Sequence, residues 1–185
     1  MTQFRFHDVA SAPPDAKPLL EGAQKKMGFI PSLYAGLAES PAALKLYFDI
    51  SDAFGKTSFT PVEQQVVLLA VSVENGCEFC VAAHSFIARQ MVKVPSPVVD
   101  ALRARTSLPD ARLQSLAAFA RKIVRERGWV APADVDTFLS AGFTRAQVLE
   151  TIMGVTMKTL SNYANHVLCT PTDAAFAAEA WRNED

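Results

Sequence analysis

Apolar residues recur every three or four positions along almost the whole chain, in segments that proline and glycine bound. This period is that of one face of an α-helix, whereas a half-buried strand alternates with a period of two. The run Thr60-Pro61-Val62-Glu63 adds a strong start signal: a threonine cap, a proline at the first helical position and a glutamate that completes a capping box. The sequence therefore predicts an all-α fold.

The same signals place the individual helices. The expected segments are about 16–27, 41–55, 61–74, 77–92, a short one after Pro95, 109–128, one after Pro132, 144–168 and a final one after Pro171. The stretch Val66–Val73 is apolar on nearly every side, which predicts burial within the bundle or between subunits. The polar end 181–185 is expected to fray.

Length and composition limit the class of protein. A chain of 185 residues predicts one domain over residues 1–185, with a motif-bearing part at about 27–92 and a C-terminal helical part at about 108–181. The formal net charge of −1 argues against a nucleic-acid partner. Apolar runs are far shorter than the roughly 20 residues of a membrane helix, and the first ten residues lack a secretory signal. A cytoplasmic protein without a membrane partner is therefore expected.

The chemistry-bearing segment is a C-x-x-C-x-x-x-H pattern formed by Cys77, Cys80 and His84. At these spacings all three side chains project from one face of a helix. The helix N-terminus favours the thiolate at Cys77 and, more weakly, at Cys80, and His84 can take a thiol proton. The two cysteines are also close enough to form a disulfide with modest backbone adjustment.

Three interpretations of this segment remain open. Cys77 and Cys80 are small core residues in the first, since free cysteine is among the most buried residue types. In the second they bind zinc with His84, and a fourth ligand has to come from His166 or Cys169 at the other end of the chain. In the third, which the spacing favours, they form a redox-active dithiol.

The run 59–85, together with 27–31 and 160–166, resembles the alkylhydroperoxidase D / carboxymuconolactone decarboxylase family, in its peroxidase-related branch. The resemblance implies an alkylhydroperoxidase D-like helical bundle that assembles as a homo-oligomer, often a trimer or hexamer. It also implies thiol-dependent reduction of hydroperoxides, with Cys80, Cys77 and His84 as the catalytic residues and without a cofactor or metal. The electron donor is then a separate thiol or protein reductant.

Two positions depart from the family pattern. Peroxidase members carry a glutamate where this chain has Gln65, which can orient the imidazole of His84 but cannot relay a proton. Phe79 stands where alkylhydroperoxidase D has an additional histidine. Glu74 and His166 are the remaining candidates for supporting roles. Because the decarboxylase members lack the dithiol pattern, lactone decarboxylation is not implied.

These residues predict a specific cycle. His84 helps to deprotonate Cys80, the thiolate attacks a peroxide oxygen, and the sulfenic acid condenses with Cys77 to a disulfide that a reductant resets. The alternative is a non-catalytic helical oligomer whose dithiol senses redox state or serves a structural role. Gln65 in place of glutamate is the feature that supports this alternative.

Overall fold

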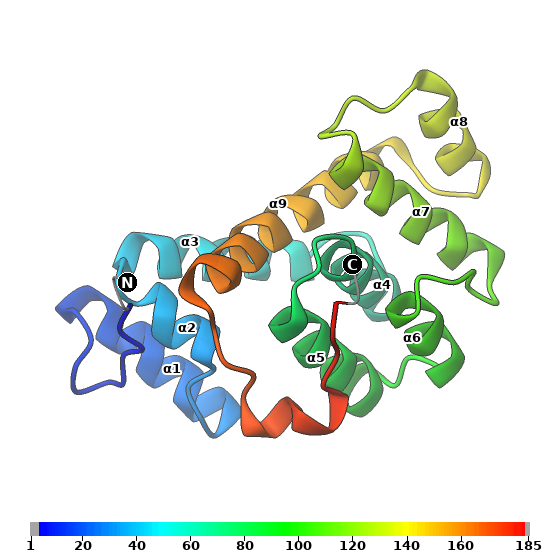
Figure 1. Cartoon of the computed structure of the whole chain (residues 1–185). Helices are drawn as coiled ribbons and strands as arrows, with labels where there is room; N and C mark the ends of the chain where they lie inside the picture. The colour runs from blue at the N-terminus through cyan, green and yellow to red at the C-terminus, as the bar shows by residue number, and fades with distance from the viewer. Residues whose placement is uncertain (1–3, 184–185) are drawn as a thin grey trace.

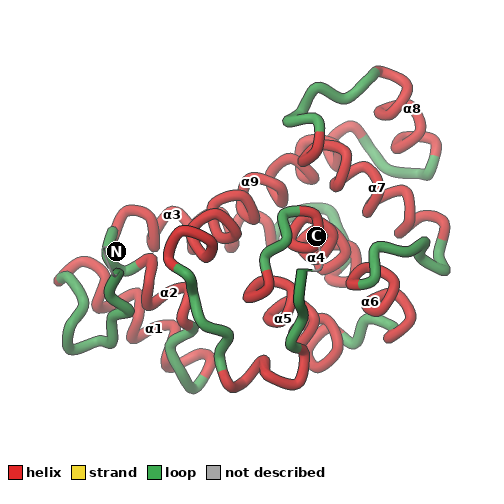
Figure 2. The backbone as a smooth tube through the Cα atoms, in the orientation of Figure 1, coloured by secondary structure: helices red, strands yellow, loops and turns green. Residues whose placement is uncertain are grey.

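The structure is a computed structural model that describes residues 4–183, and within these residues every regular element is helical (Figure 2). The α-helices are α1 (Lys17–Met27), α2 (Ser32–Leu37), α3 (Pro41–Gly55), α4 (Pro61–Glu74), α5 (Glu78–Phe86), α6 (Ser96–Arg103), α7 (Ala111–Arg125), α8 (Pro132–Ser140) and α9 (Arg145–Leu168). Shorter helical turns are Pro14–Ala16, Ile87–Val92 and Ala174–Glu179. The predicted all-α fold is confirmed.

Helix α4 is the centre of the bundle. It packs against α5, α7 and α9, and every residue from Val66 to Val73 is buried, as the sequence predicts. Figure 1 shows α9 running across the molecule, packed against α2 and α3 and, near its N-terminal part, against α7. The dithiol segment follows α4 directly, so the central helix positions it.

The start of α4 is fixed by the predicted capping box. The backbone N–H of Thr60 donates to Glu63 Oε2 at 2.8 Å, and the N–H of Glu63 donates to Thr60 Oγ1 at 3.2 Å. Thr144 and Gln147 form the same reciprocal pair at the start of α9. The first residues of α4 and α9, the two helices that face the dithiol, are therefore determined by local sequence signals.

Helix α9 approaches α3 and α4 most closely at Gly154. A Cβ atom at this position would lie 2.7 Å from Val67 Cγ1 and 2.9 Å from Phe54 Cε2. Both distances are shorter than side chains tolerate, so only glycine permits this approach without a shift of the helices. The crossing brings the following turns of α9 over the dithiol segment.

The helix expected over 77–92 is present from Glu78, with Cys77 in an extended conformation directly before it, and its last part, Ile87–Val92, is π-helical. The end expected to fray is held at Trp181, whose indole N–H donates to the carbonyl of Arg103 at 3.2 Å. Residues 184–185 of that expected end lie outside the described part. Over residues 4–183, no helix combines the length and apolar character needed to span a bilayer.

Candidate active site around a buried dithiol

The C-x-x-C turn lies between α4 and α5. Gly76, with φ of 65°, reverses the chain after α4, and Cys77 then serves as the residue before the first turn of α5. Cys77 and Cys80 are buried, with 0% and 1% of their surfaces exposed, and His84 follows one turn later and is also buried. The dithiol is thus enclosed in the protein interior.

Gln65 from α4 contacts the imidazole, as the sequence predicts. Its Oε1 atom lies 3.1 Å from His84 Nδ1. An amide oxygen only accepts hydrogen bonds, so Nδ1 carries the proton and Nε2 is left as an acceptor. Gln65 therefore fixes the orientation and the tautomer of His84.

Lys158 and Asn165 are site residues that the sequence did not indicate. Lys158 extends from α9 and is fully buried, and its Nζ atom lies 3.0 Å from His84 Nε2. In the part of the chain that the structure describes, no carboxylate forms an ion pair with it. A buried ammonium requires a compensating anion or strong hydrogen-bond acceptors. The sulfur of Cys80, with which Lys158 also hydrogen-bonds, is the available anion.

The surroundings of Cys80 stabilise its thiolate. Burial by itself raises the pKa of this thiol, but hydrogen bonding from Cys77 and the charge and hydrogen bond of Lys158 hold the pKa well below its ordinary value. The side-chain amide of Asn165 donates to Cys80 Sγ at 3.2 Å, and Ser161 Oγ lies 3.9 Å from the same sulfur. Four polar side chains thus converge on one buried sulfur atom.

The pKa of Cys77 shifts in the opposite sense to the sequence-based expectation, and the pKa of His84 is shifted as well. The pKa of Cys77 is raised, first by its hydrogen bond to Cys80 and then by burial, so the thiolate is favoured at Cys80 and not at Cys77. The Cys77 thiol donates its proton in a hydrogen bond to the Cys80 sulfur. This hydrogen bond raises the pKa of Cys77 by more than the helix N-terminus lowers it. Burial and the nearby charge of Lys158 hold the pKa of His84 well below its ordinary value. The imidazole is therefore neutral at neutral pH.

A small chamber opens onto these groups. It has a volume of about 50 Å³, and Cys80, His84 and Lys158 contribute to its wall. Most of the remaining wall is apolar or aromatic, including Phe79 and Phe176, whose ring centroids lie 6.1 Å apart. Phe79, where a family relative has a histidine, thus packs as part of the wall and supplies no proton.

The segment 170–183, here called the C-terminal strap, covers the chamber and places Phe176 in its wall. It leaves α9, passes α2 and ends beside α5, as the orange and red trace in Figure 1 shows. At its start, Asp173 accepts hydrogen bonds from the hydroxyl and the backbone N–H of Ser32, at 2.5 and 3.1 Å. The strap is therefore anchored before it reaches the chamber.

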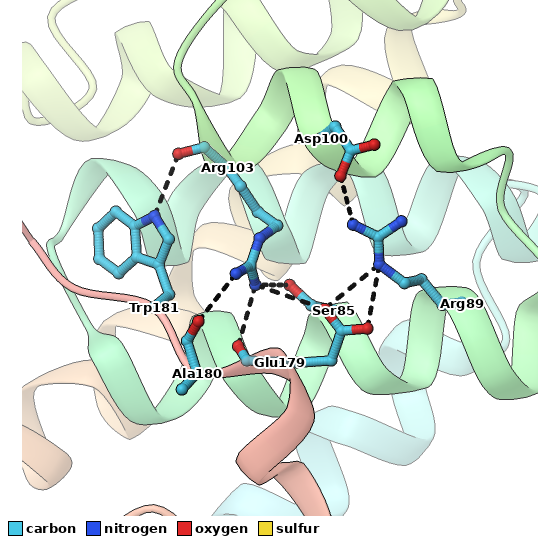
Figure 3. A network of polar contacts seen from close by, with 7 residues as sticks. All are labelled: Ser85, Arg89, Asp100, Arg103, Glu179, Ala180 and Trp181. Atoms are coloured by element: carbon cyan, nitrogen blue, oxygen red, sulfur yellow. Dashed lines mark hydrogen bonds and ion pairs between the residues drawn. The ribbon is translucent and has the colours of Figure 1, made fainter.

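A second anchor holds the other end of the C-terminal strap, and Figure 3 shows its polar contacts. Arg103 donates to the carbonyl of Ala180 at 3.0 Å, and Glu179 pairs with Arg89 at 3.1 Å. Two residues after Ala180, Arg182 pairs at 3.1 Å with Glu78, which lies between the two cysteines in sequence. The strap thus links α6 and the π-helical segment to the dithiol turn.

The other predicted residues lie elsewhere. Glu74 pairs with Arg125 of α7 at 2.9 Å, and His166 is exposed, with its ring 6.4 Å from that of Tyr163. Cys169 is exposed on the surface. Within residues 4–183, no three His, Cys, Asp or Glu side chains are grouped so that they could hold a metal ion. The site therefore consists of Cys77, Cys80 and His84 with Gln65, Lys158 and Asn165.

Comparisons with known proteins agree with this architecture. Residues 41–122 match the carboxymuconolactone decarboxylase family. None of the curated proteins compared with the chain matches it. A peroxidase-related protein from Ralstonia eutropha, an alkylhydroperoxidase AhpD core, is similar over 94% of this chain and 93% of its own, with 25% identity and a TM-score of 0.83.

Two further solved structures share the fold. A peroxidase-related protein from a Silicibacter species is 20% identical, with a TM-score of 0.79 over 95% of this chain and 96% of its own. The debrominase Bmp8, in a cysteine-to-alanine variant bound to 2,3,4-tribromopyrrole, is 14% identical, with a TM-score of 0.79 over 97% and 95%. The predicted fold and family resemblance are confirmed.

Proposed function

We propose that this chain is a thiol-dependent peroxidase that reduces hydroperoxides through Cys80 and Cys77; the match of residues 41–122 to the carboxymuconolactone decarboxylase family supports this proposal. The observation that carries the proposal is the set of groups around Cys80 Sγ, where Lys158 and Asn165 act as hydrogen-bond donors and Cys77 is the neighbouring thiol. A thiolate is the nucleophile in peroxide reduction, and an adjacent thiol can resolve the product.

The first step uses the Cys80 thiolate as nucleophile and the Lys158 ammonium as proton donor. The Cys80 thiolate attacks one oxygen of the hydroperoxide, the O–O bond breaks, and Cys80 becomes a sulfenic acid. The leaving alkoxide takes a proton from the Lys158 ammonium and departs as the alcohol. His84, neutral and oriented by Gln65, accepts the Lys158 hydrogen bond at Nε2 and holds the amine toward the sulfur.

The second step uses Cys77. Its pKa is raised chiefly by the hydrogen bond to Cys80, and that restraint disappears once the Cys80 anion has been oxidised. Cys77 then attacks the sulfenic sulfur, and its proton leaves with the hydroxyl group as water. Two electrons and two protons from a dithiol reductant restore Cys77 as thiol, Cys80 as thiolate and Lys158 as ammonium. Both cysteines are buried, so the reductant reaches them only when part of the chamber wall opens.

Thiol counting tests the site assignment directly. One equivalent of hydrogen peroxide is expected to remove two thiols per chain, because Cys77 is hydrogen-bonded to Cys80, and to leave the exposed Cys169 free. Peptide mapping of the oxidised protein checks which residues are joined. A principal disulfide that includes Cys169 contradicts the site.

Steady-state turnover separates the enzyme from the non-catalytic alternative. The proposal expects repeated consumption of hydroperoxide when excess dithiothreitol is supplied as an artificial reductant. Stoichiometric oxidation of Cys77 and Cys80 without turnover contradicts it and favours a dithiol that senses redox state.

We also propose that the protein is a homo-oligomer, with α9 in the interface. Large apolar side chains on the outer face of α9 are exposed, including Leu149 at 68%, Tyr163 at 56% and Val167 at 67%. Exposed apolar stripes of this kind mark association surfaces. Light scattering is expected to return a mass that is a multiple of 20.1 kDa, and Val167→Lys is expected to reduce it. A monomer for the unmodified chain contradicts the assembly.

A further inference from the structure

The amine of Lys158 lies where it can react with the Cys80 sulfur as well as stabilise its charge. The lysine side chain is fully buried, lines the chamber together with Cys80 and hydrogen-bonds with the sulfur. Its Nζ atom also lies 3.0 Å from His84 Nε2, which accepts a second hydrogen bond from it. Two hydrogen bonds therefore hold the nitrogen atom beside the sulfur.

The first step of the proposed cycle changes the reactivity of both atoms. Lys158 gives its proton to the leaving alkoxide and becomes a neutral amine, which is a nucleophile. Cys80 becomes a sulfenic acid, whose sulfur condenses with a thiol to a disulfide or with a neighbouring nitrogen to a sulfenamide. Reacting groups that are already held in contact combine much faster than groups that must meet in solution. Lys158 therefore has the properties of a second resolving group.

Cys77, the first resolving group, is blocked at one stage of the cycle. When a reductant thiol cleaves a disulfide, the sulfur with the lower pKa leaves more readily as thiolate. The pKa of Cys80 is lowered and that of Cys77 is raised, so the reductant binds Cys77 as a mixed disulfide and releases the Cys80 thiolate. A second peroxide that arrives at this stage oxidises Cys80 while Cys77 is occupied. Further oxidation of the sulfenic acid to the sulfinic acid is irreversible without a dedicated repair enzyme.

The size of the chamber favours the internal amine over an external thiol. A volume of about 50 Å³ corresponds to a few water-sized molecules, since one water requires roughly 10–15 Å³. Hydrogen peroxide fits this space, but a reductant thiol enters only when the wall opens. A sulfenic acid formed at Cys80 therefore meets Lys158 before it meets another thiol.

We propose that Cys80 and Lys158 form a reversible sulfenamide cross-link when Cys77 is not free to resolve the sulfenic acid. The Lys158 Nζ lone pair attacks Cys80 Sγ, an S–N bond forms and the S–O bond breaks. The departing hydroxyl takes a proton from Nζ and leaves as water, and the oxidation level of the sulfur does not change. This inference rests on the proposed peroxidase function and adds a covalent modification site to it.

Thiols reverse the cross-link. One thiol attacks Cys80 Sγ, the S–N bond breaks, and the thiol proton passes to Nζ, which is again an amine. Cys80 is then part of a mixed disulfide, and a second thiol releases it as thiolate. The cross-link therefore keeps Cys80 at an oxidation level from which it can be recovered.

The test uses a variant in which Cys80 is the only cysteine, made by combining Cys77→Ser with Cys169→Ser. Peroxide reduction in this variant stops at the sulfenic acid, which condenses with Lys158 when no trapping reagent is present. One equivalent of hydrogen peroxide is expected to lower the intact mass by two hydrogens, whereas an uncondensed sulfenic acid raises it by one oxygen. Peptide mapping should join the peptides of Cys80 and Lys158, and dithiothreitol should restore the original mass.

Two substitutions in this single-cysteine variant separate the amine from its charge. Lys158→Arg keeps a cation beside Cys80 but removes the nucleophilic amine, so the mass should rise by one oxygen and, with excess peroxide, by two or three. Lys158→Met should give the same products after slower oxidation. Lys45→Met, at an exposed lysine, is the matched control and should form the cross-link.

The results separate this inference from the proposed function. If Cys80 of the single-cysteine variant gains oxygen while Lys158 remains unmodified, the cross-link is overturned and the peroxidase proposal stands. A cross-link that dithiothreitol does not reverse also overturns the inference. If peroxide leaves Cys80 unmodified, the proposed function is contradicted, and the cross-link with it.

Discussion

Lys158→Met is expected to lower kcat/KM for hydroperoxide reduction by about 10²–10³-fold, the cost of removing one donor that stabilises charge in an enclosed site. Without the ammonium, Cys80 loses a charge and a hydrogen bond that both lower its pKa, so the pKa rises. The thiolate fraction at neutral pH then falls. The rate of the unmodified protein should be nearly constant through neutral pH, whereas the rate of the variant should rise as the solution becomes alkaline.

The measurement is the pH dependence of Cys80 alkylation, together with the peroxide kinetics. Methionine is similar in size to lysine and removes a buried charge, so thermal stability is expected to be retained. Lys45→Met is the control, because Lys45 is exposed and pairs with Asp49 on its own helix. An unshifted alkylation profile in Lys158→Met means that the ammonium does not activate Cys80.

Cys80→Ser is expected to abolish peroxide reduction, and Cys77→Ser to abolish turnover while preserving one reaction per chain. The physical reason is the asymmetry of the pair: the pKa of Cys80 is lowered and that of Cys77 is raised. In Cys77→Ser, the first step proceeds and stops at the sulfenic acid, because no resolving thiol is adjacent. Trapping with dimedone and mass spectrometry should locate one modified residue, Cys80.

Cys169→Ser serves as the control for this series, since Cys169 is exposed and outside the chamber. It should show the kinetics of the unmodified protein. If the sulfenic acid appears at Cys77 in Cys80→Ser, and that variant still consumes one peroxide, the order of attack is reversed.

Local sequence signals predict the elements that carry the dithiol. The Thr60–Glu63 capping box starts α4 where expected, and the contact between Gln65 and His84 follows from spacing and family resemblance. The protonation of the cysteine pair does not follow from local signals. A helix N-terminus favours the thiolate at Cys77, but the hydrogen bond between the two thiols and the charge of Lys158, which comes from a helix distant in sequence, lower the pKa of Cys80 instead.

Lys158 escaped prediction because one lysine on a long helix is usually a solvated residue. A signal is nevertheless present. Gly154, Lys158, Ser161 and Asn165 are spaced by four, three and four residues, which places them on one face of α9. That face is buried, so it carries polar groups where an apolar stripe is typical. These groups reach Cys80 through the packing of α9 against α5, which local sequence signals do not predict.

The ion pair of Lys158 and Cys80 also has an electrochemical consequence. In the proposed cycle, the reduced chamber contains an ammonium and a thiolate, whereas the disulfide chamber contains no charge. The attraction within the pair therefore stabilises only the reduced form, and in an enclosed, low-dielectric space this attraction is strong. Stabilising the thiolate form makes a disulfide couple more oxidising. The Cys77–Cys80 disulfide should thus have a high reduction potential, so that weakly reducing thiols suffice to reset it.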